Sequence, residues 1–235
     1  MLPLKDDQPR YSTPYVNYFV IALNLLIYFF QWVQIIQDPR GADLFAHQFG
    51  EVPAHLAAFL SGSHRYTLPQ VVLPFFTSMF LHGSWMHVIG NMWFLYIFGD
   101  NVEDYLGHFK YLVFYLLAGL IAMATQVAIY PASNVPTVGA SGAIAGVLGA
   151  YFILYPRARV LTWFFLFVFY IPAWVMLGYW FVLQFMAGAA SLSVTQMGRD
   201  VGGVAVWAHV GGFIAGMVMI KIFSERQRRS PYAYR

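Results

Sequence analysis

Residues 137–154 read TVGASGAIAGVLGAYFIL, and the rest of the architecture can be built outward from this glycine-rich, apolar run. Its glycines at positions 142, 146 and 149 are four and three residues apart, which places them on one face of a helix. Small residues on such a face let a second helix approach closely within a membrane. The stretch therefore predicts a helix over 140–154 with a flat contact face.

Five further apolar stretches accompany this one, at 15–36, 80–98, 109–130, 160–188 and 204–223. A helix needs roughly 20 mostly apolar residues to cross a bilayer. The chain is 60% hydrophobic and only 10% charged, whereas soluble domains carry about 25% charged residues. The sequence therefore predicts an all-α polytopic membrane protein with six transmembrane helices. The fifth stretch exceeds one span, which indicates a tilted helix or an interfacial piece.

The rest of the chain divides around these stretches. A polar N-terminal segment, 1–14, has no apolar run of the signal-peptide kind. We expect a single six-helix membrane domain over 15–223, followed by a basic cytoplasmic tail over 224–235. The loop over 37–79 has apolar patches of its own, so we expect it to be partly embedded or to lie on the membrane surface.

The basic residues predict the orientation of the six spans. With the N-terminus in the cytoplasm, ten of the 13 Lys and Arg residues fall in inner segments and three in outer segments. Such an excess marks the cytoplasmic side of a membrane protein. The predicted orientation is N-in, C-in, so the second, fourth and sixth helices each run from outside to inside.

Composition also limits the chemistry. The chain has no cysteine, which excludes disulfides and thiolate metal sites, and it has no His-Glu-x-x-His motif of a metalloprotease. Its formal charge of +3 is small and follows from membrane topology, so we expect no nucleic-acid partner. We expect the lipid bilayer as the surrounding medium, no metal and no cofactor. The oligomeric state stays open.

Polar side chains inside spans cost free energy and often mark function. Four stand out near the outer ends of their helices: His87 and Asn91 in the second, Ser141 in the fourth and His209 in the sixth. His82 lies at the mouth of the second helix. Because these helices all enter from outside, the polar groups are predicted to meet at one depth, in the outer third of the bilayer.

Ser141 follows Gly139 closely at the predicted start of the fourth helix. A helix N-terminus offers unpaired backbone N–H groups and a positive dipole end, which suit a developing oxyanion. Small neighbours leave the hydroxyl accessible, as a nucleophile requires. The same pattern is compatible with a small packing residue in a glycine-rich contact, and the motif alone does not separate the two interpretations.

His209 shares a helix face with Gly212 and Gly216, which lie three and seven residues further along. This glycine groove is complementary to the face that carries Gly142 and Gly146. Close packing of the two helices could bring the imidazole within hydrogen-bond reach of the serine hydroxyl, as a general base must be. The alternative is a structural histidine bonded to a carbonyl of a neighbouring helix.

His87 and Asn91 are four residues apart and share a helix face. Both can donate hydrogen bonds to an oxyanion, and they can also form a polar clamp between helices. His82 could hold water, shape the entrance or cap the loop. The acidic residue nearest to the sixth helix is Asp200 in the preceding loop. The pattern thus indicates a Ser–His dyad whose histidine tautomer is set by helix packing or water instead of a carboxylate.

Three segments, taken together, resemble the rhomboid family of intramembrane proteases. GASG at 139–142 resembles the nucleophile motif, AHVGGFIAG at 208–216 the last core helix, and HGSWMHVIGN at 82–91 the pattern of the second helix. The similarity runs in order from residue 75 to residue 216. It implies a six-helix rhomboid-like bundle and cleavage of membrane-spanning or membrane-adjacent protein substrates through an acyl-enzyme.

The resemblance also implies roles for particular residues. Ser141 and His209 would be the catalytic dyad. Glu103 resembles a structural glutamate in the inner loop that caps helix ends. Oxyanion or site-shaping roles would fall to a further set of residues: His87, Asn91, Gly139 and His82.

The sequence departs from the family pattern at two places. The first-loop Trp-Arg pair of many members falls here on Leu73 and Pro74, so that loop must be anchored differently. The position one turn after the nucleophile, often an aromatic residue stacked on the histidine, is Ala145. We therefore expect another side chain to hold the His209 ring, or the ring to be looser.

The sequence predicts a serine endopeptidase whose substrates enter beside the fifth span or beneath a mobile loop at 190–201. A rhomboid-like protein without protease activity, which binds membrane clients, is the first alternative, although its usual sign is loss of the serine or histidine. A haem- or ion-binding transporter using His82, His87 and His209 is the second, but the first two of these share a helix face poorly. The compact core suggests a prokaryotic inner membrane.

Overall fold

The computed structural model describes residues 1–38, 41–196 and 205–223. Its elements follow in chain order: β1 (Leu2–Asp6), α1 (Tyr15–Gln37), α2 (Gly41–Phe49), α3 (Pro53–Leu60), α4 (Leu68–Thr77), the 3-10 turn η1 (Ser78–Phe80), α5 (Trp85–Leu106), α6 (His108–Ile129), α7 (Ser141–Leu154), β2 (Arg159–Phe164), β3 (Phe167–Pro172), α8 (Ala173–Gln196) and α9 (Val206–Phe223).

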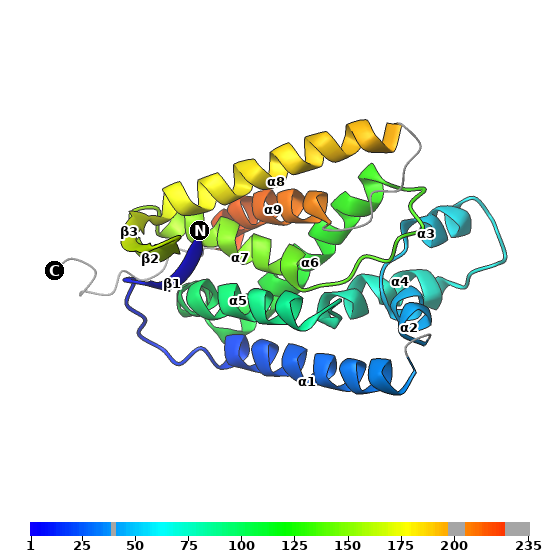
Figure 1. Cartoon of the computed structure of the whole chain (residues 1–235), viewed down its shortest axis with the longest axis horizontal. Coiled ribbons are helices and arrows are strands. Elements are labelled where there is room, and N and C mark those ends of the chain that lie inside the picture. Colours follow the sequence, from blue (N-terminus) through cyan, green and yellow to red (C-terminus); the bar gives the residue numbers. More distant parts are fainter. Residues whose placement is uncertain (39–40, 197–204, 224–235) are drawn as a thin grey trace.

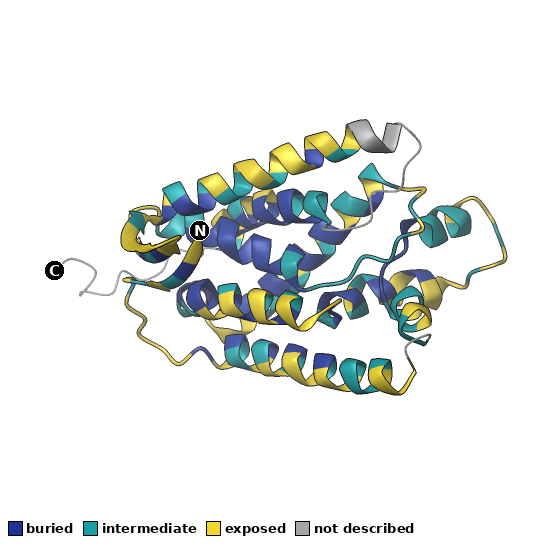
Figure 2. Ribbon diagram, in the orientation of Figure 1, coloured by how far each residue is buried: buried dark blue, intermediate teal, exposed yellow. Residues whose placement is uncertain are grey.

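Helix α7 lies at the centre of a helical bundle (Figure 1). Every residue from Gly142 to Tyr151 is buried, because α5, α6 and α9 pack around it and α8 covers part of the remaining side. Figure 2 shows α7 in the colour of buried residues, whereas α1 and α8 present exposed faces at the two edges of the bundle. The glycine-rich sequence thus forms the core of the molecule.

Four helices in the described part of the chain are long and apolar enough to cross a bilayer: α1, α6, α9 and the Ala173–Leu192 portion of α8. Large apolar side chains are exposed on the edge helices, such as Phe30 on α1 and Met186 on α8. A surface of this kind is suited to lipid contact and not to water. The chain is therefore a mostly helical integral membrane protein.

The prediction of one long helical stretch over 160–188 is wrong in its first half. Residues 159–172 form an antiparallel hairpin, β2–β3, which extends into a three-stranded sheet through pairing of β2 with β1. Val, Trp, Phe and Tyr dominate the hairpin, and these side chains favour extended backbone. Phe165, with φ of 55°, makes the tight turn. The expectation of an all-α protein is corrected accordingly.

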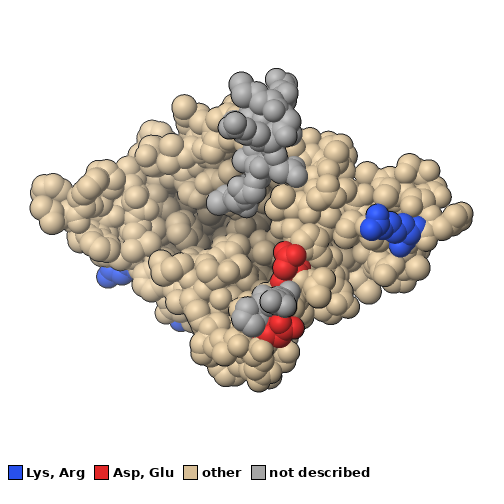
Figure 3. All heavy atoms as spheres, turned by 45° about the vertical axis from the view of Figure 1, so that its right-hand side comes forward, with Lys and Arg blue, Asp and Glu red and all other residues tan. Residues whose placement is uncertain are grey.

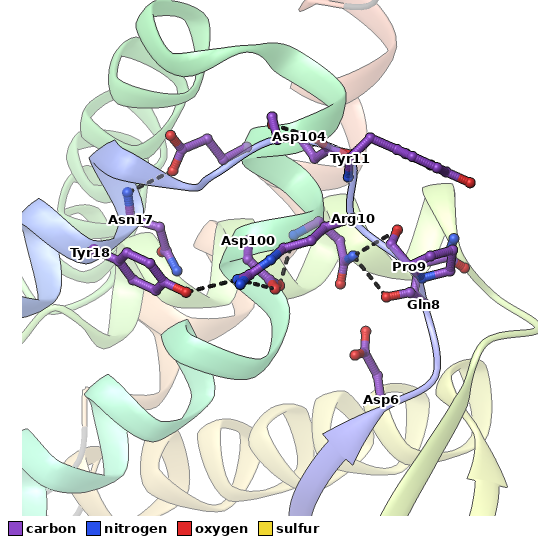
Figure 4. A network of polar contacts seen from close by, with 12 residues as sticks. Asp6, Gln8, Pro9, Arg10, Tyr11, Asn17, Tyr18, Asp100 and Asp104 are labelled. Carbon is purple, nitrogen blue, oxygen red and sulfur yellow. Dashed lines mark hydrogen bonds and ion pairs between the residues drawn. The ribbon is translucent and has the colours of Figure 1, made fainter. Parts of the chain in front are cut away.

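The polar segment before α1 is ordered against the inner ends of α5 and the sheet (Figure 4). The Arg10 guanidinium donates to the Tyr18 hydroxyl at 2.8 Å and pairs with Asp100 at 3.4 Å. The Tyr11 backbone N–H donates to Asp104 at 3.1 Å. These contacts tie the N-terminal segment to the C-terminal half of helix α5.

Glu103 lies inside α5 and not in a loop, and it caps the N-terminus of α1. Its carboxylate accepts the backbone N–H groups of Val16 at 3.0 Å and Asn17 at 2.6 Å. The Asn17 side chain in turn accepts the Tyr111 hydroxyl at 2.7 Å. A buried carboxylate is satisfied here by otherwise unpaired helix donors, which agrees with the capping role expected from the sequence.

At the opposite end, the predicted loop over 37–79 contains the short helices α2, α3 and α4 (Figure 1). Thr67 and Gln70 form a capping box at the start of α4, and Thr77 donates to the Phe49 carbonyl at 2.6 Å. These contacts anchor the part of the loop where Leu73 and Pro74 replace the family's Trp-Arg pair. The segment packs over the loop that leads into α7.

Candidate active site

Ser141 is the first residue of α7, and the chain is held on both sides as it enters this helix. Glu51 and Thr137 exchange backbone hydrogen bonds of 3.0 and 2.7 Å, and the Gly139 N–H donates to the Ser78 carbonyl at 2.8 Å. Gly139 has a φ of 129°, which only glycine adopts readily. The serine is therefore presented on a constrained turn at a helix N-terminus.

His209 on α9 meets this serine directly. Its Nε2 lies 2.7 Å from the Ser141 Oγ, and the imidazole is buried. The contact joins residues 68 positions apart in sequence. This distance is within the range that a general base requires.

The glycines of α7 and α9 bring the two backbones close enough for that contact. A Cβ added to Gly216 would stand 1.9 Å from the Gly146 carbonyl oxygen, and one added to Gly212 would stand 2.2 Å from the Gly142 carbonyl oxygen. Side chains larger than hydrogen would force the helices apart at both places. The predicted complementary faces are thus in direct backbone contact.

The other nitrogen of the His209 ring contacts helix α8. Its Nδ1 lies 2.8 Å from the Gln184 Oε1. Trp180, one turn earlier on α8, places its ring 5.8 Å from the imidazole at an interplanar angle of 36°. Two side chains of α8 therefore hold the histidine, where the sequence offers only Ala145 on α7.

His87 and Asn91 reach the same place from α5. The His87 ring lies against Gly139, since a Cβ added there would be 2.9 Å from both its Cε1 and Nε2. Asn91 Nδ2 is 3.0 Å from the His82 Nε2. Both residues line the cavity that Ser141 also lines.

His82 lies behind the cavity and not at its mouth. It is fully buried, and its backbone exchanges hydrogen bonds with the Gln31 side chain of α1 at 2.8 and 3.2 Å. Its ring is 5.0 Å from the His87 ring and contacts Asn91. The residue supports the two polar groups in front of it instead of facing the open space.

A cavity of about 760 Å³ opens over these groups. Gln126 of α6 lies in its wall, and its Oε1 accepts the Ala208 backbone N–H at 3.2 Å beside the histidine. Within the described ranges, no three His, Asp or Glu side chains gather where they could hold a metal ion. Polar and aromatic residues that line the cavity come from α5, α6, the 130–138 loop, α7 and α9: His87, Asn91, Gln126, Tyr130, Ser141 and His209.

Glu51 is a buried carboxyl beside this site and outside the membrane-spanning helices. Only 1% of its surface is exposed, and its Oε2 has no hydrogen-bond partner. Burial raises the pKa of Glu51 to about 7. Its backbone pairs with Thr137, four residues before the serine, so the carboxyl belongs to a residue that holds the segment leading to Ser141.

Three polar or aromatic residues around the dyad were not singled out from the sequence: Gln126, Trp180 and Gln184. The two glutamines lie in apolar spans, and a polar residue within a span is a signal for function. Gln184 and Trp180 are four residues apart, which places them on one helix face. Only the packing of α8 on α9 shows that this face meets His209.

The fold and the site together define a helical integral membrane protein with a serine–histidine pair that lines a cavity between its helices. The rhomboid domain model matches residues 69–226, which is more than half of the chain. The chain belongs to the rhomboid family.

Curated relatives agree with this assignment. Rhomboid-like protein 11, chloroplastic, of Arabidopsis thaliana is 30% identical over 64% of this chain and 52% of its own length. Rhomboid protein 1, mitochondrial, of Saccharomyces cerevisiae is 32% identical over 65% of this chain and 43% of its own. Presenilin-associated rhomboid-like protein A, mitochondrial, of Danio rerio is 29% identical over 62% and 36%. The chain thus matches about half of these relatives' length or less.

Proposed function

We propose that the protein is an intramembrane serine endopeptidase that cleaves transmembrane or membrane-adjacent segments of other proteins. The observation that carries this proposal is the 2.7 Å contact between Ser141 Oγ and His209 Nε2 at the wall of a large cavity. Nucleophile and base within hydrogen-bond reach are the signature of covalent acyl transfer. Membership in the rhomboid family supports the same activity.

The proposed reaction has two halves. Ser141 Oγ attacks the scissile carbonyl carbon while His209 Nε2 takes the hydroxyl proton, and the resulting imidazolium gives that proton to the leaving amine. Water then attacks the acyl-enzyme, with the imidazole again as base, and Ser141 regains its proton when the acid product leaves. No additional oxidant, reductant or cofactor enters this balance.

The negative oxygen of each tetrahedral intermediate needs donors. The Ser141 backbone N–H at the start of α7, the His87 ring and the Asn91 amide lie on the cavity side where that oxygen would form. Asn91 has two amide hydrogens, so one can remain on His82 while the other points to the oxyanion. Preorganised donors of this kind supply a large part of the acceleration in acyl transfer.

We further propose that α5 and α7 complete six spans with both termini in the cytoplasm. The bias of basic residues and the polar network around Arg10 support that orientation. Substrates would enter past α8. The loop expected over 190–201 is helical as far as Gln196, where α8 ends, and 197–201 lie outside the described residues. The prokaryotic inner membrane stays a prediction, and the names of the curated relatives point instead to chloroplasts and mitochondria.

A rhomboid-like protein that binds membrane clients without cleaving them is the alternative class. Some relatives carry only the name rhomboid-like. The presence of both dyad residues in hydrogen-bond contact favours the enzyme.

The proposal predicts that Ser141→Ala and His209→Ala each abolish cleavage of a membrane-embedded substrate in liposomes. Each removes one member of a pair that acts as a unit, so the double variant should be no worse than either single one. A fluorophosphonate probe should label the wild type and not Ser141→Ala. Unchanged thermal unfolding in detergent is the control for folding. Full activity of Ser141→Ala would exclude the mechanism.

A further inference from the structure

The geometry points to Gln184 as the residue that sets the tautomer of His209, and this inference rests on the proposed protease function. We propose that its carboxamide oxygen takes the place that a carboxylate has in a Ser–His–Asp triad. The oxygen lies 2.8 Å from Nδ1, while Nε2 on the other side of the ring lies 2.7 Å from Ser141 Oγ. The three groups form one continuous chain of hydrogen bonds.

The chemistry of the base requires this arrangement. A neutral imidazole carries one proton, and the nitrogen without it is the acceptor. With Gln184 Oε1 as acceptor, the proton resides on Nδ1, so Nε2 keeps the lone pair that takes the serine proton. An apolar neighbour at Nδ1 would leave the proton free to move to Nε2, where it blocks the reaction. The carbonyl oxygen of Gln184 thus selects the reactive form.

The membrane explains why a carboxamide does this task. An ionised carboxylate within a span is costly, and burying it leaves a charge to be compensated. A glutamine accepts the same hydrogen bond without a charge. No Asp or Glu of the described residues is in hydrogen-bond contact with the His209 ring, whose two nitrogens are occupied by Ser141 and Gln184.

Trp180, which lies on α8 like Gln184, also contacts the His209 ring. Its indole lies 5.8 Å from the imidazole and 6.1 Å from the ring of Phe213, which follows His209 by one turn on α9. The Trp180 indole beside the imidazole restricts rotation of the His209 ring, and the hydrogen bond to Gln184 fixes the direction in which Nδ1 points. The aromatic partner missing at Ala145 is thus supplied by α8.

Gln184 and Trp180 both lie on α8, a helix at the edge of the bundle (Figure 1), so the position of α8 should affect activity. α8 packs mainly on α9 and exposes apolar side chains such as Val182 and Met186 on its outer face. A movement of α8 away from the bundle would withdraw Gln184 and Trp180 from His209 at once. The base is therefore fully aligned only while α8 is seated against α9.

Two substitutions separate the positioning role from simple packing. Gln184→Leu removes the acceptor and keeps similar volume, and we expect kcat and the rate of fluorophosphonate labelling to fall on the order of 100-fold, with KM nearly unchanged. Gln184→Glu keeps an acceptor and should restore most of the rate. Leu183→Ala, on the outward side of α8, should behave as the wild type.

A spectroscopic measurement tests the inference without reference to turnover. Imidazole ¹⁵N chemical shifts of His209 should report a proton on Nδ1 in the wild type and a shift toward the Nε2–H form in Gln184→Leu. A wild-type ring protonated on Nε2 would overturn the proposal, as would full kcat in Gln184→Leu. Equal loss of kcat and thermal stability in Gln184→Leu and Gln184→Glu would show a structural role instead.

The same experiments distinguish failure of this inference from failure of the proposed function. A wild type that cleaves its substrate and labels at Ser141, beside an equally active Gln184→Leu, refutes only the role of Gln184. A wild type that neither cleaves nor labels refutes the protease, and with it any catalytic meaning of the tautomer.

Discussion

The residues around Ser141 achieve their arrangement almost without charge. The side-chain contacts that the structure gives for the dyad join Ser141 to His209 and His209 to Gln184, and beside them Asn91 contacts His82. Within a bilayer, neutral groups lose less hydration energy than ions, so a network of this kind can be buried at lower cost. Each of these uncharged contacts is weak, so neighbouring side chains must hold the groups in position.

Gly139 is one residue where that geometry should be measurable. In Gly139→Ala the new Cβ would meet the His87 ring at 2.9 Å, and the φ of 129° would strain the backbone by about 1–3 kcal/mol. We expect loss of cleavage together with reduced thermal stability. Gly107→Ala is the matched control, since its φ is 77° with no neighbour within 4 Å. It should lose stability and keep activity, and equal activity of both variants would contradict the clash with His87.

Glu51 should make stability depend on pH. Its pKa rises from 4.5 to about 7 on folding, so the folded state binds more protons between these values. The free energy of unfolding should therefore be highest below pH 4.5 and fall by roughly 3 kcal/mol as the pH rises through 7. Glu51→Gln should remove most of this slope in denaturant titrations.

The control for Glu51 is Asp43→Asn on the exposed side of α2, which should keep the slope. A second slope of similar size will remain in Glu51→Gln at lower pH, because burial also raises the pKa of Asp6, at the other end of the molecule, from 3.8 to about 6. Identical pH profiles of the wild type and Glu51→Gln would show that the Glu51 carboxyl is solvated.

At the scale of elements, the contact between α7 and α9 places Ser141 beside His209. Ser141 and His209 are the outer residues of two helices whose backbones touch at Gly142, Gly146 and Gly212. The approach of the helix axes therefore determines the distance between nucleophile and base. Helix α8 contacts the His209 ring from a third side, where we propose that Gln184 sets which ring nitrogen carries the proton.

Gly216→Ala should separate these helices. Its Cβ would be placed 1.9 Å from the Gly146 carbonyl oxygen, and overpacking of this kind costs about 1–3 kcal/mol or more. We expect a lower unfolding temperature and slower labelling of Ser141, because the dyad distance grows. Gly90→Ala on α5 meets nothing within 4 Å and should be neutral or stabilising by up to about 1 kcal/mol. Similar stability of both variants would contradict the close contact.

At the scale of the whole molecule, the two ends differ in character. The inner end is closed by the β1–β2–β3 sheet and by the ion pairs Arg10–Asp100 and Arg159–Asp7. The opposite end carries the short helices α2, α3 and α4 beside the cavity. Figure 3 looks onto this end and shows the surface hollowed there. Under the proposed orientation, water would reach the dyad from the outer side of the membrane.

The predicted orientation can be tested directly because the chain has no cysteine. We expect Tyr11→Cys to react with an impermeant maleimide only from the cytoplasmic side, and Ser61→Cys, between α3 and α4, only from the opposite side. Both positions are exposed. Labelling of both from one side would show that residues 11 and 61 lie on the same side of the membrane, and would refute the assignment of six spans.

Composition and spacing were enough to predict membrane insertion, the position of the central helix and the residues Ser141, His209, His87 and Asn91 as one cluster. They suffice because hydropathy, helical periodicity and the cost of polar groups in lipid are local properties of the chain. The hairpin at 159–172 was not predicted, because a long apolar run of aromatic and β-branched residues is compatible with either a helix or a strand.

The partners of the His209 Nδ1 were decided by tertiary structure alone. Gln184 is marked locally as a polar residue within an apolar span, but neither it nor Trp180 carries a local sign of its partner, because their role depends on which face of α8 meets α9. The same holds for Glu51, whose raised pKa comes from the packing of the outer loop and not from its neighbours in sequence. Sequence thus specified the reacting groups, while the docking of separate elements set their distance, their tautomer and their access to water.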